Sequence, residues 1–196
     1  MEIILASGSP RRRGLLGQMG VRNFRTLTPD IDEHSDRPLP PGRLVETISA
    51  EKARAVAAQA GPDALVIAAD TVVALDGAVL GKPADPADAR RMLAALSGRR
   101  HQVYTGFTVL RGGEAVTRSE ATEVAFRPLS PGEIDAYVST GEPLDKAGAY
   151  GIQGVGALLV ERIRGDYFNV MGLPVCALGQ VLAGFGVDCL ALSARR

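Results

Sequence analysis

The sequence is poor in the residues from which several common kinds of site are built. It has 196 residues, but only two of them are cysteines and two are histidines. Cys176 and Cys189 form neither a CxxC pair nor the framework of a disulfide-rich protein. With only His34 and His101 present, an HExxH zinc helix is impossible and a histidine-based catalytic triad has few candidates.

The sequence also lacks an excess of charge of either sign and any long apolar run. Lys+Arg and Asp+Glu both number 22, so the net charge is zero, whereas a general nucleic-acid binder normally carries a basic excess. No apolar run approaches the roughly 18 residues that span a membrane. The short apolar start runs directly into three arginines, which is the wrong order for a secretory signal. We therefore expect a cytoplasmic protein with no nucleic-acid partner and no membrane partner.

The pattern that is present is typical of an α/β protein, because strand signals alternate with helix signals. Strands are expected at residues 2–7, 24–28, 65–75, 79–80, 102–110, 115–128 and 157–163. Helices are expected at residues 10–19, 43–60, 86–96, 131–140 and 175–183. The turns Asp76-Gly77 and Gly112-Gly113 predict two hairpins, so the sheet is mixed rather than purely parallel. No linker separates independent domains, and residues 1–196 are expected to form one domain.

The first strand–helix junction, from Ser7 to the arginines at 11–13, has the composition of an anion-binding site. Its small residues let backbone N–H groups turn toward a ligand, and the start of a helix carries partial positive charge. Arg12 falls on the same helix face as Leu15 and Leu16, which directs it inward. The alternative is a solvated basic turn, which explains an inward arginine poorly.

Two charged residues interrupt apolar patterns. Lys52 falls within the apolar stripe of the helix expected at 43–60. It either extends past the edge of the core or directs its ammonium at a phosphate or carboxylate in a cleft. Asp70 is the one carboxylate in the apolar strand at 65–75, so it needs a cation, hydrogen bonds or a metal. A reactive role is favoured over a structural role at a bend in the sheet.

Three further features give weaker signals. The acidic residues of the loop at 29–42, Glu33 among them, suit Mg²⁺ or Mn²⁺, although such loops are often only solvated. Lys82 follows Gly81 directly after a hairpin, but the Walker A spacing is missing. Gln153 lies in the glycine-rich segment at 148–156, where its amide can recognise the edge of a base. A tight turn with no ligand is the alternative.

Several segments together resemble the Maf family of nucleoside triphosphate pyrophosphatases, also described as septum-formation inhibitor proteins. The matching segments are LASGSPRRR at 5–13, EKA at 51–53, AADTVV at 68–73, GKP at 81–83, SG at 97–98 and DKAGAYGIQG at 145–154. The resemblance implies a Maf/ITPase-like α/β fold: a mixed twisted sheet flanked by helices, with two lobes and a central cleft. It also implies hydrolysis of a nucleoside triphosphate to the monophosphate and pyrophosphate, with a divalent cation, Mg²⁺ or Mn²⁺.

The resemblance further implies roles for individual residues. Asp70 matches the catalytic carboxylate, which is described as the proton acceptor. Asp70 and Glu33 are also the expected metal ligands. The positions associated with substrate choice are Arg12, Thr71 and Gln153. The polar positions around the phosphates are Ser7, Arg13, Lys52 and Lys82. The form DKAGAYGIQG is similar to the branch that acts on dTTP and UTP, not to the branch that acts on 7-methyl-GTP.

A second hypothesis, of another class, is a nucleotide-binding regulator of cell division that does not hydrolyse its ligand. The carboxylate at position 70 and the cationic positions disfavour it, because a sensor has no need of a carboxylate beside a triphosphate. The apolar hairpins are compatible with a homodimer.

Overall fold

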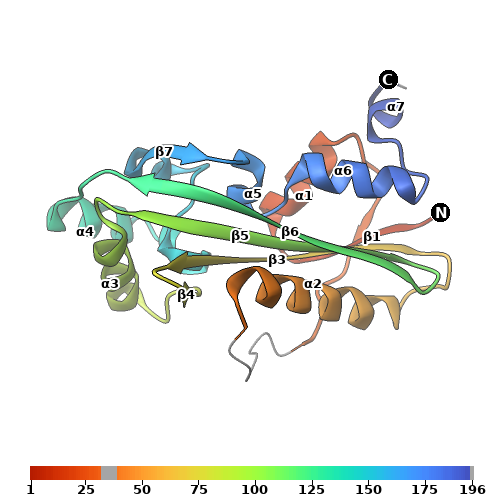
Figure 1. Cartoon of the computed structure of the whole chain (residues 1–196), viewed down its shortest axis with the longest axis horizontal. Coiled ribbons are helices and arrows are strands. Elements are labelled where there is room, and N and C mark those ends of the chain that lie inside the picture. Colours follow the sequence, from red (N-terminus) through yellow and green to blue (C-terminus); the bar gives the residue numbers. More distant parts are fainter. Residues whose placement is uncertain (32–38, 195–196) are drawn as a thin grey trace. The chain divides into compact units, whose positions relative to one another are not determined.

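The computed structural model describes residues 1–31 and 39–194. Its described strands form a seven-stranded mixed sheet in the order β2-β1-β3-β5-β6-β7, with β4 paired to β3, and helices flank the sheet (Figure 1). The predicted α/β class and mixed sheet are therefore confirmed.

The chain divides into two compact units. The first comprises Met1–Asp70, Thr105–Glu120 and Gly172–Arg196, and the second comprises Thr71–Tyr104 and Ala121–Met171. Three strands contribute residues to both units: β3 (Leu65–Leu75), β5 (Arg100–Arg111) and β6 (Glu114–Phe126). The single domain and the cleft between lobes stay predictions.

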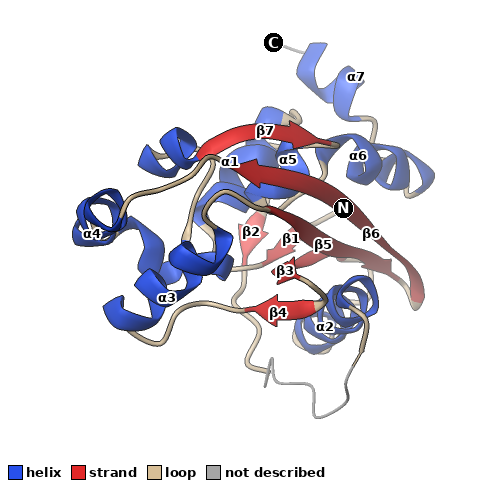
Figure 2. Ribbon diagram, turned by 60° about the vertical axis from the view of Figure 1, so that its left-hand side comes forward, coloured by secondary structure: helices blue, strands red, loops and turns tan. Residues whose placement is uncertain are grey.

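The first unit is built on β1 (Ile3–Ala6), which pairs in parallel with β2 (Arg25–Thr26) and with β3. Its helices are α1 (Pro10–Gln18), α2 (Pro41–Ala57), α6 (Val175–Gly184) and α7 (Cys189–Ala194). α2 covers one face of these strands, and α1 and α6 lie on the other (Figures 1 and 2). Side chains alternate along a strand, so one face of β1 and β3 packs on α2. That core includes Ile4, Ala6, Val66 and Ala68 from the strands and Ala53 and Val56 from the helix.

α2 lies very close to β5 because position 106 carries no side chain. A Cβ atom at Gly106 would lie 2.4 Å from the backbone C and O atoms of Val45 in α2. Hydroxyl groups continue the contact: Ser49 Oγ lies 3.0 Å from Thr108 Oγ1, which lies 2.9 Å from Thr117 Oγ1. These contacts fix the position of α2 against the sheet.

Gly106→Ala should therefore destabilise the protein by about 3 kcal/mol, because backbone atoms cannot move aside as a flexible side chain can. The measurement is the free energy of unfolding in urea. Gly14→Ala is the matched control: a Cβ atom at Gly14 meets nothing within 4 Å, and alanine in a helix should raise stability by up to about 1 kcal/mol. Equal stability of the two variants would contradict the close packing at Gly106.

The second unit has its own core. Antiparallel pairs join β3 to β4 (Ala78–Leu80) and β6 to β7 (Val160–Arg164). Its helices are α3 (Pro86–Leu96), α4 (Pro131–Ser139) and α5 (Tyr167–Met171). Short 3-10 helices span Glu142–Asp145, Ala147–Ala149 and Val155–Leu159. The core is apolar and includes Val73, Leu93, Leu96, Val103, Val124, Phe126 and Tyr150.

Both predicted hairpins are confirmed, but three other predictions need correction. The strand expected at 157–163 begins only at Val160, because Val155–Leu159 forms a 3-10 helix. Hydrogen bonds from the N–H groups of Val155 and Gly156 to Glu142 tie this apolar stretch into a turn. The helices α5 and α7 were not expected, and α6 is not the last helix. α5 has five residues and α7 has six, which is too few to show a helical period.

Among the described residues, no helix combines the length and the apolar character needed to cross a lipid bilayer.

Candidate active site

The carboxylate within β3 is buried and paired with a lysine. Lys52 Nζ lies 2.8 Å from Asp70 Oδ1, and the two side chains are only 6% and 10% exposed. The ammonium compensates the charge of the carboxylate and donates a hydrogen bond to it, which explains how an apolar strand tolerates an aspartate. Lys52 does not extend past the edge of the core. Its ammonium meets the carboxylate of Asp70, and the cleft in which it was expected to meet a ligand stays a prediction.

Helix and strand periods together explain this pair. The buried residues of α2 follow a helical stripe: Val45, Ile48, Ser49, Lys52, Ala53 and Val56. On β3, Asp70 shares the face of Val66 and Ala68, because side chains two residues apart point the same way. That face packs on α2. Lys52 and Asp70 are thus charged members of an otherwise mostly apolar contact, and each compensates the charge of the other.

The junction of β1 and α1 holds an arginine in a fixed position. Arg12 Nε donates to the carbonyl of Gly172 at 2.8 Å, and Arg12 Nη1 donates to Ser7 Oγ at 3.3 Å. Ser9 caps the helix, and its Oγ accepts from the N–H of Arg12 at 3.4 Å. The prediction that Arg12 is directed inward is therefore confirmed, and the solvated basic turn is wrong for Arg12. Arg13 is exposed, and its role at the phosphates stays a prediction.

In the second unit, the loops that carry two further candidates meet. The N–H of Gly148 donates to the carbonyl of Gly81 at 3.0 Å, which joins the loop of Lys82 to the glycine-rich segment of Gln153. Both candidate side chains are exposed, and Thr71, which follows Asp70 in β3, is half-buried. The side chains of Lys82 and Gln153 are therefore accessible to a ligand.

The site residues thus fall into groups. The structure brings Ser7 together with Arg12 and Lys52 together with Asp70, all in the first unit. Thr71, Lys82 and Gln153 belong to the second unit. Glu33 and its neighbours Asp32 and Asp36 lie outside the described residues. The catalytic, binding and metal-ligand roles of these residues stay predictions.

Comparison with known sequences identifies the family. The family described as Maf-like protein matches residues 2–185. The chain belongs to this family. The dTTP/UTP pyrophosphatase of Moorella thermoacetica is 58% identical over 190 residues, which cover 95% of this chain and 96% of the relative. The dTTP/UTP pyrophosphatase of Symbiobacterium thermophilum is 52% identical over 185 residues, which cover 94% of each.

A solved structure resembles this Maf-like chain in fold. It is that of a HAM1 protein from Coxiella burnetii, with a TM-score of 0.56 and 18% sequence identity over 94% of this chain and 99% of that chain. At such low identity the likeness shows a common fold and nothing about chemistry.

Of the two histidines, the structure describes one, and it belongs to the core of the second unit. The ring of His101 packs edge-on against Phe126 and Tyr150, and His101 Nε2 lies 2.8 Å from the hydroxyl of Tyr150. Burial lowers the pKa of His101 to about 4, so the ring is neutral near pH 7. His34 lies outside the described residues.

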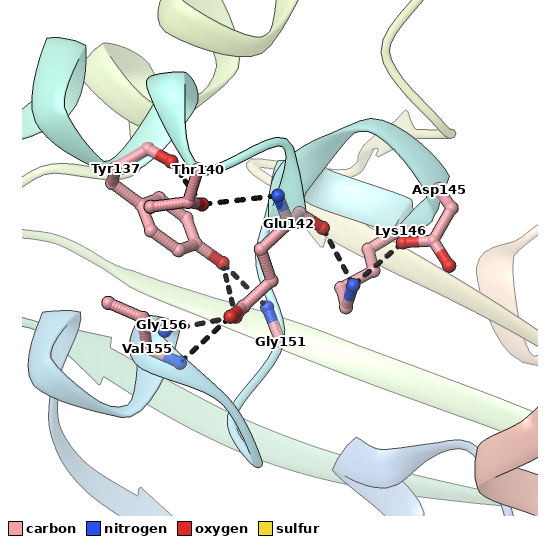
Figure 3. Close-up of polar contacts among 8 residues, drawn as sticks. All are labelled: Tyr137, Thr140, Glu142, Asp145, Lys146, Gly151, Val155 and Gly156. Atoms are coloured by element: carbon pink, nitrogen blue, oxygen red, sulfur yellow. Dashed lines mark hydrogen bonds and ion pairs between the residues drawn. The ribbon is translucent and has the colours of Figure 1, made fainter.

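Sequence reasoning missed Glu142. Its carboxylate accepts hydrogen bonds from the hydroxyl of Tyr137 and from the N–H groups of Val155 and Gly156 (Figure 3). A lone glutamate in a polar stretch looks solvated in sequence. The available signal was the glycine-rich segment that follows, because backbone N–H groups without large side chains need acceptors from elsewhere.

Proposed function

We propose that this Maf-like chain is a nucleoside triphosphate pyrophosphatase that hydrolyses dTTP and UTP to the nucleoside monophosphate and pyrophosphate. The observation that carries the proposal is the buried pair of Lys52 and Asp70. A buried ion pair adds little to stability, because the cost of desolvating both charges offsets their attraction. Its presence in an apolar strand therefore points to a chemical role. The substrate class rests on the two relatives above, both dTTP/UTP pyrophosphatases.

Asp70 is the proton acceptor in the proposed reaction. A water oxygen attacks the α-phosphorus and forms a new P–O bond, and the bond from that phosphorus to the oxygen bridging to the β-phosphorus breaks. Pyrophosphate leaves with the bonding electron pair, and a proton of the water passes to Asp70. Lys52 holds Oδ1 of the carboxylate, and in the proposal the proton passes to the carboxylate.

Cations and a hydroxyl bind the phosphates. Arg12 is anchored by Ser7 and Gly172, so its charge is preorganised and little reorganisation is needed when phosphate charge develops. The remaining polar groups assigned to the phosphates are Ser7, Arg13, Lys52 and Lys82. Substrate choice is assigned to Arg12, Thr71 and Gln153. The hydroxyl of Thr71 and the amide of Gln153 complement the donor and acceptor atoms of uracil and thymine.

A divalent cation completes the proposed site, with Asp70 and Glu33 as the residues that would hold it. Mg²⁺ prefers oxygen ligands and is commonly bound through one or two carboxylates together with substrate phosphates, which fits this donor set. Among the described residues, no three His, Cys, Asp or Glu side chains gather into a metal site. In the proposal, substrate phosphates supply further ligands. When bound, Mg²⁺ or Mn²⁺ neutralises charge on the phosphate oxygens.

The proposal predicts that purified protein with Mg²⁺ releases pyrophosphate and monophosphate in equal amounts from UTP and dTTP, and that EDTA stops the reaction. The measurement is a pyrophosphate-coupled assay over UTP, dTTP, CTP, GTP and 7-methyl-GTP. Binding of UTP without hydrolysis would indicate the regulator instead. Release of orthophosphate would indicate a different phosphoester hydrolase.

A further inference from the structure

One carboxylate in the second unit holds the segment that carries Gln153. Glu142 Oε1 accepts from the hydroxyl of Tyr137 at 2.9 Å and from the N–H of Gly156 at 3.0 Å, and Oε2 accepts from the N–H of Val155 at 2.8 Å (Figure 3). The same Tyr137 hydroxyl accepts from the N–H of Gly151 at 3.2 Å. Residues 151–156 are thus tied at both ends to Glu142, directly at one end and through Tyr137 at the other.

The segment fits closely around this carboxylate. A Cβ atom at Gly154 would lie 2.3 Å from Glu142 Oε2, so only glycine allows the backbone to come so near. Lys146 fixes the other side of the glutamate, because its Nζ donates to the carbonyl of Glu142 at 2.6 Å and to Asp145 Oδ1 at 2.7 Å. Backbone, carboxylate and lysine therefore hold one another in place.

Glu142 is an anion in this arrangement. Burial by itself would raise the pKa of Glu142, but the N–H groups of Gly156 and Val155, the hydroxyl of Tyr137 and the charge of Lys146 outweigh it. The net result is a pKa below the usual value. The ionised carboxylate accepts three hydrogen bonds, and hydrogen bonds to a charged acceptor are stronger than those between neutral groups.

Gln153 lies in the middle of this tied segment, and its side chain is exposed. We propose that Glu142 is a positioning residue: by holding both ends of residues 151–156 it fixes the Gln153 amide, and so sets the preference of the site for uracil and thymine. The inference rests on the proposed function, because it concerns how the base of that substrate is chosen. Without the carboxylate, the segment and its amide would adopt several positions.

Glu142→Gln tests the proposal with almost no change of shape. Glutamine has one side-chain oxygen, so one carboxylate oxygen that accepts a hydrogen bond is replaced by an NH₂ group, which would face an N–H or O–H donor. We expect the KM for UTP to rise about 10-fold, as for the loss of one to two hydrogen bonds to a charged group, while kcat changes less. The preference for UTP over CTP should fall by a similar factor.

The decisive measurement is the same substitution made in the Gln153→Ala variant. Gln153→Ala alone should lose turnover of UTP and dTTP more than turnover of poorer substrates. If Glu142 acts through Gln153, adding Glu142→Gln should then change the preference by less than about 2-fold, because residues that act as a unit are not additive. Additive losses of preference in the two backgrounds would overturn the proposal.

Two further readouts separate positioning from stability and from the proposed function. Glu133→Gln is the matched control, since Glu133 completes the capping box of α4 and should leave base preference unchanged. Binding of an uncleavable α,β-imido analogue of UTP tests the positioning without turnover. If the wild type binds the analogue with a preference for uridine and Glu142→Gln removes that preference, the inference stands. It stands even if the wild type releases no pyrophosphate from UTP, because the lack of release refutes only the proposed enzyme activity. A wild type without uridine preference, or a variant that keeps it, overturns the inference.

Discussion

Asp70→Asn should lower the rate of pyrophosphate release from UTP by about 1,000-fold, while nucleotide binding persists. Asparagine has the size of aspartate and keeps an oxygen that can accept from Lys52, whose Nζ lies 2.8 Å from Oδ1 in the wild type. It cannot take a proton from the attacking water. The measurements are kcat from pyrophosphate release at saturating UTP and the Kd for UTP by calorimetry.

Asp76→Asn is the control for this substitution. Asp76 follows β3 and pairs with Arg99 at 2.6 Å, but the aspartate side chain is 71% exposed. Its φ of 51° is one that asparagine adopts readily, so the exchange should leave turnover at the wild-type level. Turnover of Asp70→Asn that matched the wild type would remove Asp70 from the mechanism.

Much of the fold follows from local sequence signals. The strand expected at 65–75 and the helix expected at 86–96 have the same bounds as β3 and α3. A long apolar run that ends in Asp76-Gly77 defines the strand. For α3, a proline opens the helix and the side chain of Asp85 caps it, accepting from the N–H of Asp88 at 2.8 Å. The sequence prediction was wrong where tertiary contacts determine the local structure, as in the 3-10 helix at Val155–Leu159.

The site was only partly predictable, because its pairs join distant parts of the sequence. Lys52 and Asp70 each interrupt an apolar pattern, and that interruption marked both. Their pairing depends on how closely α2 lies against the sheet, which is set partly by the missing side chain at Gly106. No pattern within either segment contains that information. Glu142 shows the same limit, since its three donors come from residues 5 to 14 positions away.

Lys52→Met should destabilise the protein by about 3–5 kcal/mol, because it leaves the Asp70 carboxylate buried without its cation. Methionine resembles lysine in length and packs well in an irregular space, so the loss comes from charge and not from a cavity. The measurement is the free energy of unfolding in urea. Turnover of UTP should fall as well, since the carboxylate would lose the hydrogen bond that fixes Oδ1.

The double variant Lys52→Met/Asp70→Asn shows whether charge is the cause. It removes the uncompensated carboxylate, so it should be more stable than Lys52→Met alone, yet it should release no pyrophosphate. The exposed pair of Arg99 and Asp76, with side chains 46% and 71% exposed, provides the comparison: Arg99→Met should cost less than about 1 kcal/mol. A Lys52→Met variant as stable as Arg99→Met would mean that Asp70 is compensated by other groups. A double variant no more stable than Lys52→Met would mean that packing, and not charge, makes Lys52 necessary.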